Sequence, residues 1–385
     1  MTKNNSTEVL NTDALLDRAR HKAFTNQAAL ERIAAALFDE GDAALSELDR
    51  SLMDNSLRVL VRDIETRILT EIAHHRDAPV VFAKLFGQNG AASRDHGYAY
   101  PILVKAGLLR ATGLIEVIKH RMQTHRLTLS LLCLRRESHG ASLKEEPQLN
   151  IIQSLLVAPE PDSVDRLKGF IDAENDKLDS FHYPLIRPVD LPHALVRQLC
   201  WWITAALRSQ VITQSRTAPG SLDAWFERAA TTVLDQLSGD SSTRDEADGV
   251  IDILTASGRF SPELLMQLLS QGEVSLFEAG FARITGLRKT LVSRLLYETG
   301  GECLAVACKA VGFDSATFET IYGYTRRGRL ATDAARNGNQ DITDGADSDE
   351  IDIFDSVEQI AAVAVLEWWR RDGDFLYAIK LLERE

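Results

Sequence analysis

The stretch that decides the fold reads DIETRILTEIAHH (63–75), DAPVVFAKLFGQ (77–88), YAYPILVKAGLL (98–109) and ATGLIEVIKHRMQTHR (111–126). Each segment has the apolar spacing of a short amphipathic helix: Ile64, Ile68 and Ile72, for example, recur every four residues and share one helical face. Helices this short cannot bury their apolar faces alone, so they must stack on neighbouring helices. The sequence therefore predicts stacked helical hairpins.

The rest of the chain continues the helical pattern, and no useful period-two strand pattern interrupts it, so we expect an all-α protein. Polar stretches rich in Gly, Pro or acidic residues mark the breaks between its parts. The expected parts are a disordered N-terminus (1–11), the stacked-hairpin domain (12–137), a linker (138–150), a compact helical bundle (151–330), an acidic flexible linker (331–350) and a C-terminal helix (351–385).

Local signals place some of the helix ends. Ser46 is expected to begin a helix, with Asp49 three residues later as a carboxylate of the capping-box type. Gly286 is expected to end one. The segment FHYPLIRPVDLPHAL (181–195) holds three prolines, which predicts an extended connector before the long apolar helix that follows.

Composition limits the class of protein. The 385 residues are 45% hydrophobic and 26% charged, which is ordinary for a soluble globular chain. A net charge of -13 argues against sequence-independent nucleic-acid binding, which needs a basic face. The polar start and the lack of a long apolar run predict a cytoplasmic protein without a membrane segment. The four cysteines are expected to be buried, reduced thiols.

Two basic groups are the candidate binding residues. Lys119, His120, Arg121, His125 and Arg126 crowd one helix and could receive an anion or an acidic peptide, although a solvated helical face is the favoured interpretation. The second group makes the C-terminal bundle locally basic and consists of Arg283, Arg288 and Lys289, with Arg294 and the TRRGR segment (325–329) nearby. We expect no metal site and no cofactor, because the histidine spacing and the acidic run 341–352 fit no known ligand pattern.

Adjacent tryptophans form a third candidate. Trp368 and Trp369 sit about 100° apart on a helix, so the pair spans a wide apolar face. Core packing and an interface anchor are both open, since tryptophan is common in both settings.

Several segments also resemble the bacterial "domain of unknown function 2336" proteins, which are common in alphaproteobacteria. The resemblance lies in the segments from Asp63 to Ser130, in LIRPVDLPHALVRQLCWWITAALRSQ (185–210) and in 268–313. It implies HEAT-like helical repeats in the N-terminal half. It brings no catalytic residues to this chain.

Three functions follow as hypotheses. The first is a non-enzymatic protein-interaction scaffold or regulatory adaptor, because stacked helical pairs build extended binding surfaces. Its partner would be a protein, and a homodimer remains open. The second is a small-molecule or nucleotide sensor that binds at a basic patch. The third is an enzyme with an unrecognised helical site, which the lack of nucleotide-loop, zincin and nucleophile-elbow motifs disfavours.

Overall fold

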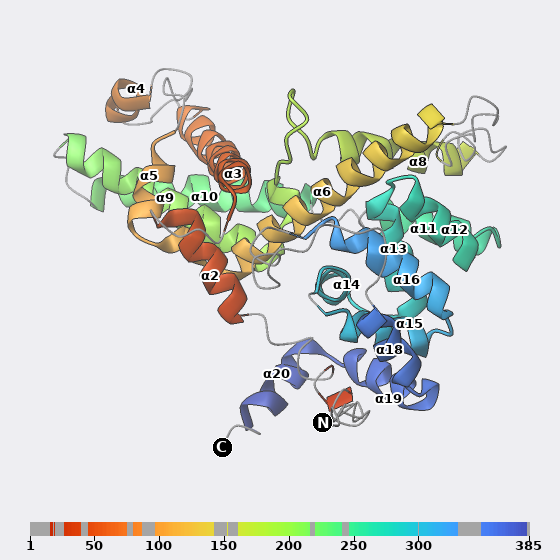
Figure 1. Ribbon diagram of the computed structural model, residues 1–385. Helices are drawn as coiled ribbons and strands as arrows, with labels where there is room; N and C mark the ends of the chain where they lie inside the picture. The colour runs from red at the N-terminus through yellow and green to blue at the C-terminus, as the bar shows by residue number, and fades with distance from the viewer. Residues whose placement is uncertain are drawn as a thin grey trace. The chain divides into compact units, whose positions relative to one another are not determined.

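The computed structural model describes residues 16–17, 19, 27–39, 45–74, 80–86, 97–141, 152, 161–215, 220–240, 246–298, 300–329 and 348–382 (Figure 1). Over these ranges the chain is helical and contains no β-strand, which confirms the predicted all-α class; an isolated β-bridge joins Leu178 to Pro184. The predictions for 1–11, 142–150 and 331–347 fall outside the described residues.

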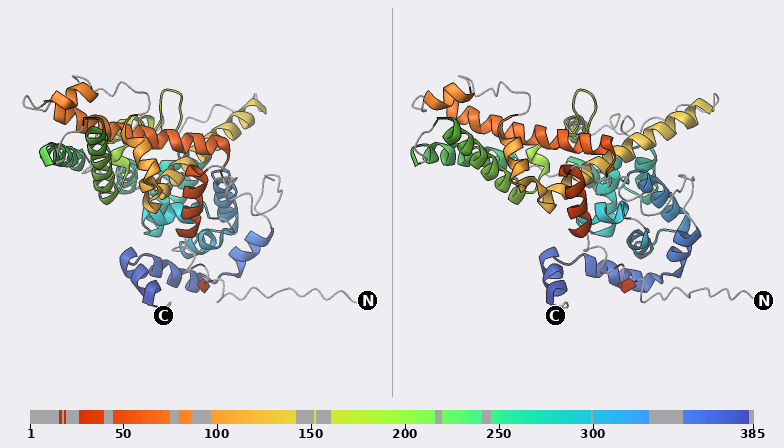
Figure 2. Two further views of the ribbon diagram at one scale, coloured as in Figure 1. Left: turned by 90° about the vertical axis from the view of Figure 1, so that its left-hand side faces the viewer. Right: turned by 60° about the vertical axis from the view of Figure 1, so that its left-hand side comes forward.

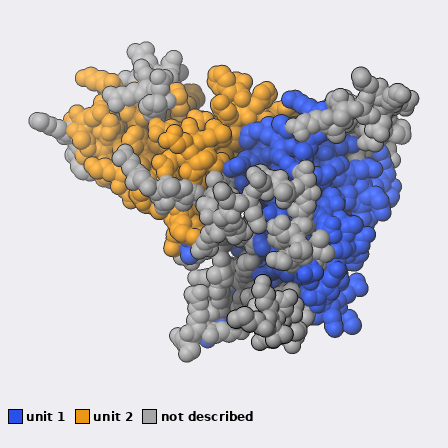
Figure 3. Space-filling view, viewed as in Figure 1, with its two compact units in different colours: residues 1–28, 123–168, 247–385 blue, residues 29–122, 169–246 orange. Residues whose placement is uncertain are grey.

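The chain divides into two compact units (Figure 3). Unit 1 consists of residues 1–28, 123–168 and 247–385, and unit 2 consists of residues 29–122 and 169–246. The sequence instead predicted consecutive domains separated by a linker at 138–150. The chain passes between the units within helices α2 (Gln27–Phe38), α6 (Thr112–Ala141) and α8 (Pro161–Asn175), and at the start of α11 (Glu246–Ala256). Each unit is therefore assembled from stretches that are far apart in sequence.

Unit 2 is built around α3 (Glu47–His74), which packs against α9 (His193–Ser215) and α10 (Gly220–Asp240). The predicted apolar face of α3 is confirmed, because Ile64, Ile68 and Ile72 are all buried. Contact reaches across the sequence: Gln236 donates a hydrogen bond to Glu71 at 2.9 Å although 165 positions separate them. Helices distant in sequence thus supply much of this core, and a HEAT-like arrangement stays a prediction.

Smaller elements complete unit 2. They are α2 (Gln27–Phe38, apart from its first two residues), α4 (Val80–Phe86), α5 (Ala99–Lys105), the first part of α6 (112–122), the end of α8 (169–175), and the 3-10 turns η1 (Leu108–Arg110) and η2 (Pro188–Asp190). Both α4 and α5 pack against α3 and α9. The ring of Phe82 on α4 meets Phe226 on α10 edge-on, with centroids 5.3 Å apart.

Helix α3 is longer than the sequence predicted. It runs unbroken for 28 residues and joins the helix expected at Ser46 to the segment 63–75, so the expectation of separate short helices is wrong here (Figure 2). Ion pairs one turn apart, Asp54 with Arg58 and Asp63 with Arg67, support helix on both sides of the expected break. The cap at the start is confirmed: the Ser46 hydroxyl accepts the Asp49 amide at 3.1 Å and donates to the Asp49 carboxylate at 2.7 Å.

A buried carboxylate organises the start of α5. Glu65 lies on the buried face of α3 and accepts the backbone amides of Tyr98 and Ala99, each at 2.9 Å. These amides belong to the first turn of α5, which has no side-chain cap of its own. Gly97 precedes them with φ of 67°, and a Cβ there would approach a Glu65 carboxylate oxygen to 3.0 Å. Only glycine suits that backbone without strain.

Unit 1 surrounds α15 (Glu302–Ala310), in which Cys303 to Cys308 are all buried. Unit 1 also holds the later part of α6 (123–141) and the first part of α8 (161–168). Its other helices are α11, α12 (Pro262–Ser270), α13 (Val274–Thr285), α14 (Lys289–Leu296), α16 (Ser315–Arg326), α18 (Ser348–Ser356), α19 (Gln359–Trp369) and α20 (Gly373–Leu382). Helix α15 packs against α14, α16, α18 and α19. Gly286 ends α13 in the left-handed conformation, as the sequence predicted.

The C-terminal segment differs from the single helix expected over 351–385. It forms α18, α19 and α20, separated by short turns at Val357 and after Arg370. Phe354, near the end of α18, and Val357, at the turn, are both buried.

The cysteines divide into two classes. Cys200, Cys303 and Cys308 are buried, as predicted, and burial raises the pKa of Cys200 to about 11. The prediction is wrong for Cys133, which is exposed on α6. Its neighbours Leu129 and Leu132 are also exposed, whereas Leu127 and Leu131 are buried, so Cys133 lies off the core-facing stripe of α6.

Candidate interaction site

The most unusual surface of unit 2 is the loop of residues 176–187, which follows α8. Its two arms pair through the Leu178–Pro184 bridge and through Leu185, whose amide donates to the Lys177 carbonyl at 2.8 Å. At the turn, the Asp179 amide donates to the Tyr183 carbonyl at 2.9 Å. The connector expected from its prolines is thus extended, as predicted, but folded back on itself.

The tip of this loop is held by one carboxylate. Asp179 Oδ1 accepts the backbone amides of Phe181 and Tyr183, both at 2.8 Å, as short polar side chains do in tight turns. His182 lies between them with φ of 63°, a left-handed conformation that costs energy for a residue with a Cβ. Local hydrogen bonds therefore hold a strained turn in place.

The turn presents two aromatic side chains to solvent. Phe181 is 76% exposed and Tyr183 is 45% exposed, and their ring centroids lie 6.4 Å apart with planes tilted by 33°. A phenylalanine left in water forgoes roughly 1.5–3 kcal/mol of burial energy. This unfavourable exposure occurs at the tip of an ordered turn, where aromatic side chains could anchor a contact with a partner.

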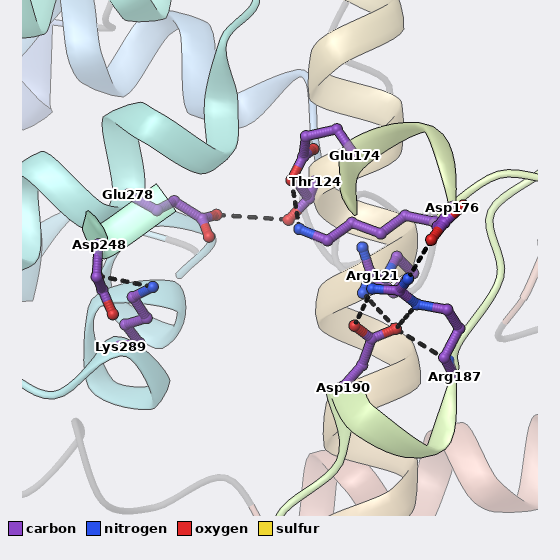
Figure 4. Close-up of polar contacts among 10 residues, drawn as sticks. Arg121, Thr124, Glu174, Asp176, Arg187, Asp190, Asp248, Glu278 and Lys289 are labelled. Atoms are coloured by element: carbon purple, nitrogen blue, oxygen red, sulfur yellow. Dashed lines mark hydrogen bonds and ion pairs between the residues drawn. The ribbon is translucent and has the colours of Figure 1, made fainter. Parts of the chain in front are cut away.

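Ion pairs brace the base of the loop (Figure 4). Arg187 Nη1 lies 2.8 Å from Asp176, and the Arg187 amide donates to Asp190 Oδ2 at 2.9 Å. Asp190 also pairs with Arg121 of α6 at 3.2 Å, and both side chains are largely buried, at 11% and 15% exposure. Lys177 pairs with Glu174 at the end of α8. The base of the loop is thus tied to α6, α8 and η2.

The basic residues predicted on α6 do not form an open cationic face. Lys119, His120, Arg121, His125 and Arg126 are all half-buried. Arg121 belongs to the brace with Asp190. The boundary between the units falls after Met122, so the first three residues belong to unit 2 and the last two to unit 1.

The second predicted basic group lies beside carboxylates of α11. Arg283 pairs with Asp252 at 3.5 Å, and Lys289 pairs with Asp248 at 2.8 Å (Figure 4). Arg288, the N-cap residue of α14, is exposed. These acidic partners offset the positive charge that the sequence alone suggested for this group.

The two C-terminal tryptophans have different environments. Trp369 is fully buried, on a helix that packs against α15, and its indole nitrogen has no hydrogen-bond partner among the described residues. Trp368 is half-buried, with the Arg371 guanidinium 4.7 Å from its ring centroid. Of the pair, Trp369 fits the core-packing interpretation, whereas Trp368 keeps an accessible surface.

A buried polar cluster ties unit 1 together. The Tyr297 hydroxyl donates to Glu278 Oε1 at 3.0 Å. Figure 4 shows the second contact, in which the Thr124 hydroxyl lies 3.4 Å from the same oxygen. Burial and, after it, the Glu278 charge raise the pKa of Tyr297 well above its usual range, so this phenol stays protonated as a donor. These contacts join α6 to α13 and to the end of α14, so the cluster stabilises the packing of unit 1.

Sequence reasoning missed Phe181, Tyr183 and Asp179. The three prolines identified a connector, but its aromatic content was not weighed. A usable signal was present, because two aromatic residues flank His182 in a segment that is otherwise polar up to Pro184.

Comparison with known protein families gives a match for part of the chain. Residues 173–348 match the model of a family described as "Uncharacterised protein conserved in bacteria (DUF2336)". The chain is similar to DUF2336 over this region. The resemblance expected from the sequence is confirmed there, while the resembling segment from Asp63 to Ser130 lies outside the match. The DUF2336 region includes the whole 176–187 loop and α9 to α16.

Two further comparisons add no relative. Neither the curated proteins nor the solved structures gave a match to this chain. Among the helices of the described ranges, none is both long and apolar enough to span a bilayer.

Proposed function

We propose that this protein is a non-enzymatic adaptor or scaffold that binds another protein, and that the 176–187 loop of its DUF2336 region makes the contact. The observation that carries the proposal is the exposed pair Phe181 and Tyr183 at a tip fixed by Asp179. Aromatic residues are enriched among the side chains that dominate protein interfaces. A tip already ordered in the free protein loses little conformational entropy on binding.

The helical frame supports the same proposal. Arg187 and Asp190 connect the base of the loop to Arg121 on α6. A partner that binds the tip would therefore contact a loop anchored to a helix. The helical-repeat surface that the sequence predicts would extend such a contact beyond the loop.

A sensor of small anions at a basic patch is the less favoured alternative. Arg121, Arg283 and Lys289 each have a carboxylate within 3.5 Å, which weakens the field available to a phosphate. A thermal-shift screen with nucleotides tests this alternative directly, and a stabilisation lost in Arg288→Ala would revive it.

Site-specific photocrosslinking tests the proposal. The full chain is expressed in a bacterium that carries the gene, with p-benzoylphenylalanine at position 181 and, as the matched control, at the exposed Gln214 of α9. We expect one discrete protein adduct at 181 and none at 214. The purified partner should then bind the wild-type chain at least tenfold more tightly than a Phe181→Ala/Tyr183→Ala variant. A chain that forms no protein adduct at 181, or forms equal adducts at both positions, does not act through this loop.

A further inference from the structure

Resting on the proposed function, we infer that the partner offers the 176–187 loop a basic segment, with an arginine or lysine side chain seated on the Phe181–Tyr183 pair. Three properties of the loop lead to this chemistry: its charge, the geometry of its rings and the Asp179 carboxylate in the same turn.

The loop and its flanks are acidic. Residues 172–190 contain five carboxylates against one lysine and one arginine. Both cations are engaged within the segment, Lys177 with Glu174 and Arg187 with Asp176 and Asp190. Asp172 is exposed one turn before the loop begins. The field around the tip is therefore negative and favours a cationic partner.

The rings are arranged to receive a cation. Their centroids lie 6.4 Å apart and their planes are tilted by 33°, so they do not cover each other in a close stack. A guanidinium or ammonium placed over an aromatic face within about 6 Å is attracted by the ring quadrupole. The same chain uses this contact internally, since Arg58 lies 4.5 Å from the Tyr100 ring centroid.

The carboxylate of Asp179 adds to the attraction. Its Oδ1 accepts the amides of Phe181 and Tyr183, which fixes a negative charge at the turn that carries both rings. An aromatic pair over a carboxylate binds a cation through both the ring faces and the charge. The same charge disfavours anionic lipid and nucleic acid, whose phosphates it repels.

A selection experiment tests the inference with a defined probe. The wild-type full chain is immobilised and panned against a phage-displayed library of random dodecapeptides. We expect the recovered peptides to be enriched in arginine and lysine. Recovery of acidic or purely apolar peptides, or failure to enrich any peptide, would overturn the inference.

Matched variants separate a cation–π contact from plain apolar burial. Phe181→Leu/Tyr183→Leu keeps bulky apolar side chains but removes the ring faces. We expect it to weaken a selected synthetic peptide about 3- to 30-fold, the range of such contacts, while Phe181→Trp restores or improves binding. Circular dichroism checks that both variants fold. If the leucine variant binds as tightly as wild type, the rings act only as apolar anchors, and the inference fails while the proposed function stands.

The charge component has its own readout. Asp172→Asn should weaken the peptide about 2-fold or more, and the wild-type affinity should fall as sodium chloride rises from about 50 to 300 mM. An affinity that ignores both changes contradicts the inference. So does tip-dependent binding to vesicles containing phosphatidylglycerol, or self-association that the leucine variant abolishes in sedimentation. If a partner crosslinks at position 181 and any of these contrary results is found, only the inference of a cationic partner fails. If no protein crosslinks at position 181, the proposed function itself fails.

Discussion

Glu65 caps α5 at Ala99, across 34 positions of sequence, with 2.9 Å between its Oε2 and the Ala99 amide nitrogen. The carboxylate is fully buried on the face of α3 that forms the core of unit 2. Burial raises its pKa, against the opposing effects of the Ala99 and Tyr98 amides and the Arg62 charge. The Glu65 side chain therefore joins two helices, and burial of its charged form is unfavourable.

Removal of this cap should destabilise the protein. Glu65→Ala leaves the buried amides of Tyr98 and Ala99 without an acceptor, so we expect a loss of about 2–4 kcal/mol in unfolding free energy, measured in urea. Glu71→Ala is the control on the same helix, because Glu71 makes an exposed contact and should cost about 0.5 kcal/mol or less. Equal losses for the two variants would show that Glu65 does not cap α5.

The pH dependence of stability should carry the signature of Glu65. Since its folded pKa lies above its ordinary value of 4.5, folding favours the protonated form. This contribution is fully present below the ordinary value and is lost as pH rises through the folded pKa. We expect Glu65→Gln, which cannot ionise, to gain stability relative to wild type as pH rises from 4.5. Parallel urea midpoints for both proteins between pH 4 and 8 would rule this out.

Asp190 should control the order of the 176–187 loop. Asp190→Ala deprives Arg121 and Arg187 of their shared carboxylate and the Arg187 amide of its acceptor. Arg121 and Asp190 are largely buried, whereas Arg187 is more exposed and keeps Asp176 as a partner, so we expect a loss of about 1–3 kcal/mol. Hydrogen exchange should report faster exchange of the Leu185 amide than in wild type. The control Asp223→Ala removes an exposed partner of Arg208 and should leave the loop protected.

The neighbouring tryptophans should respond differently to truncation. Trp369→Ala empties a fully buried site and should cost about 3–5 kcal/mol, whereas Trp368→Ala should cost about 1 kcal/mol. Thermal or urea unfolding of the two variants measures the contrast. If Trp368 proves equally costly, the turn after α19 contributes more to the core than its exposure indicates.

The thiols provide a rapid test of burial. Cys133 is exposed, and Cys200, Cys303 and Cys308 are not. We expect one thiol per native chain to react quickly with Ellman's reagent, and four after denaturation. Cys133→Ser should abolish the fast phase; a fast phase that survives this substitution would mean that a buried helix opens readily.

The sequence predicted the helices well where apolar spacing is regular. Ile64, Ile68 and Ile72 marked a buried face, and Ser46 and Gly286 marked real helix ends. Such signals succeed because helical geometry repeats over a few residues and depends on local chemistry.

Pairing between distant helices escaped the same reasoning. Nothing in the pattern around Ile64 indicates that α9 and α10 cover it, because any apolar stripe of suitable width would satisfy a helix face. Glu65 shows the same limit: its position on the apolar face was visible, but its partner amides at Tyr98 and Ala99 were not. The basic candidates on α6 and α14 were named from charge alone, and their acidic partners became evident only in three dimensions.

The interleaved course of the backbone has a practical consequence for anyone who clones this gene. A fragment encoding only 173–348 would carry α9 and α10 but not α3, the helix against which both pack. The apolar faces of α9 and α10 would then be exposed to water, and exposed apolar faces make a fragment prone to aggregate. Production of the matched region therefore requires the upstream sequence that contains α3.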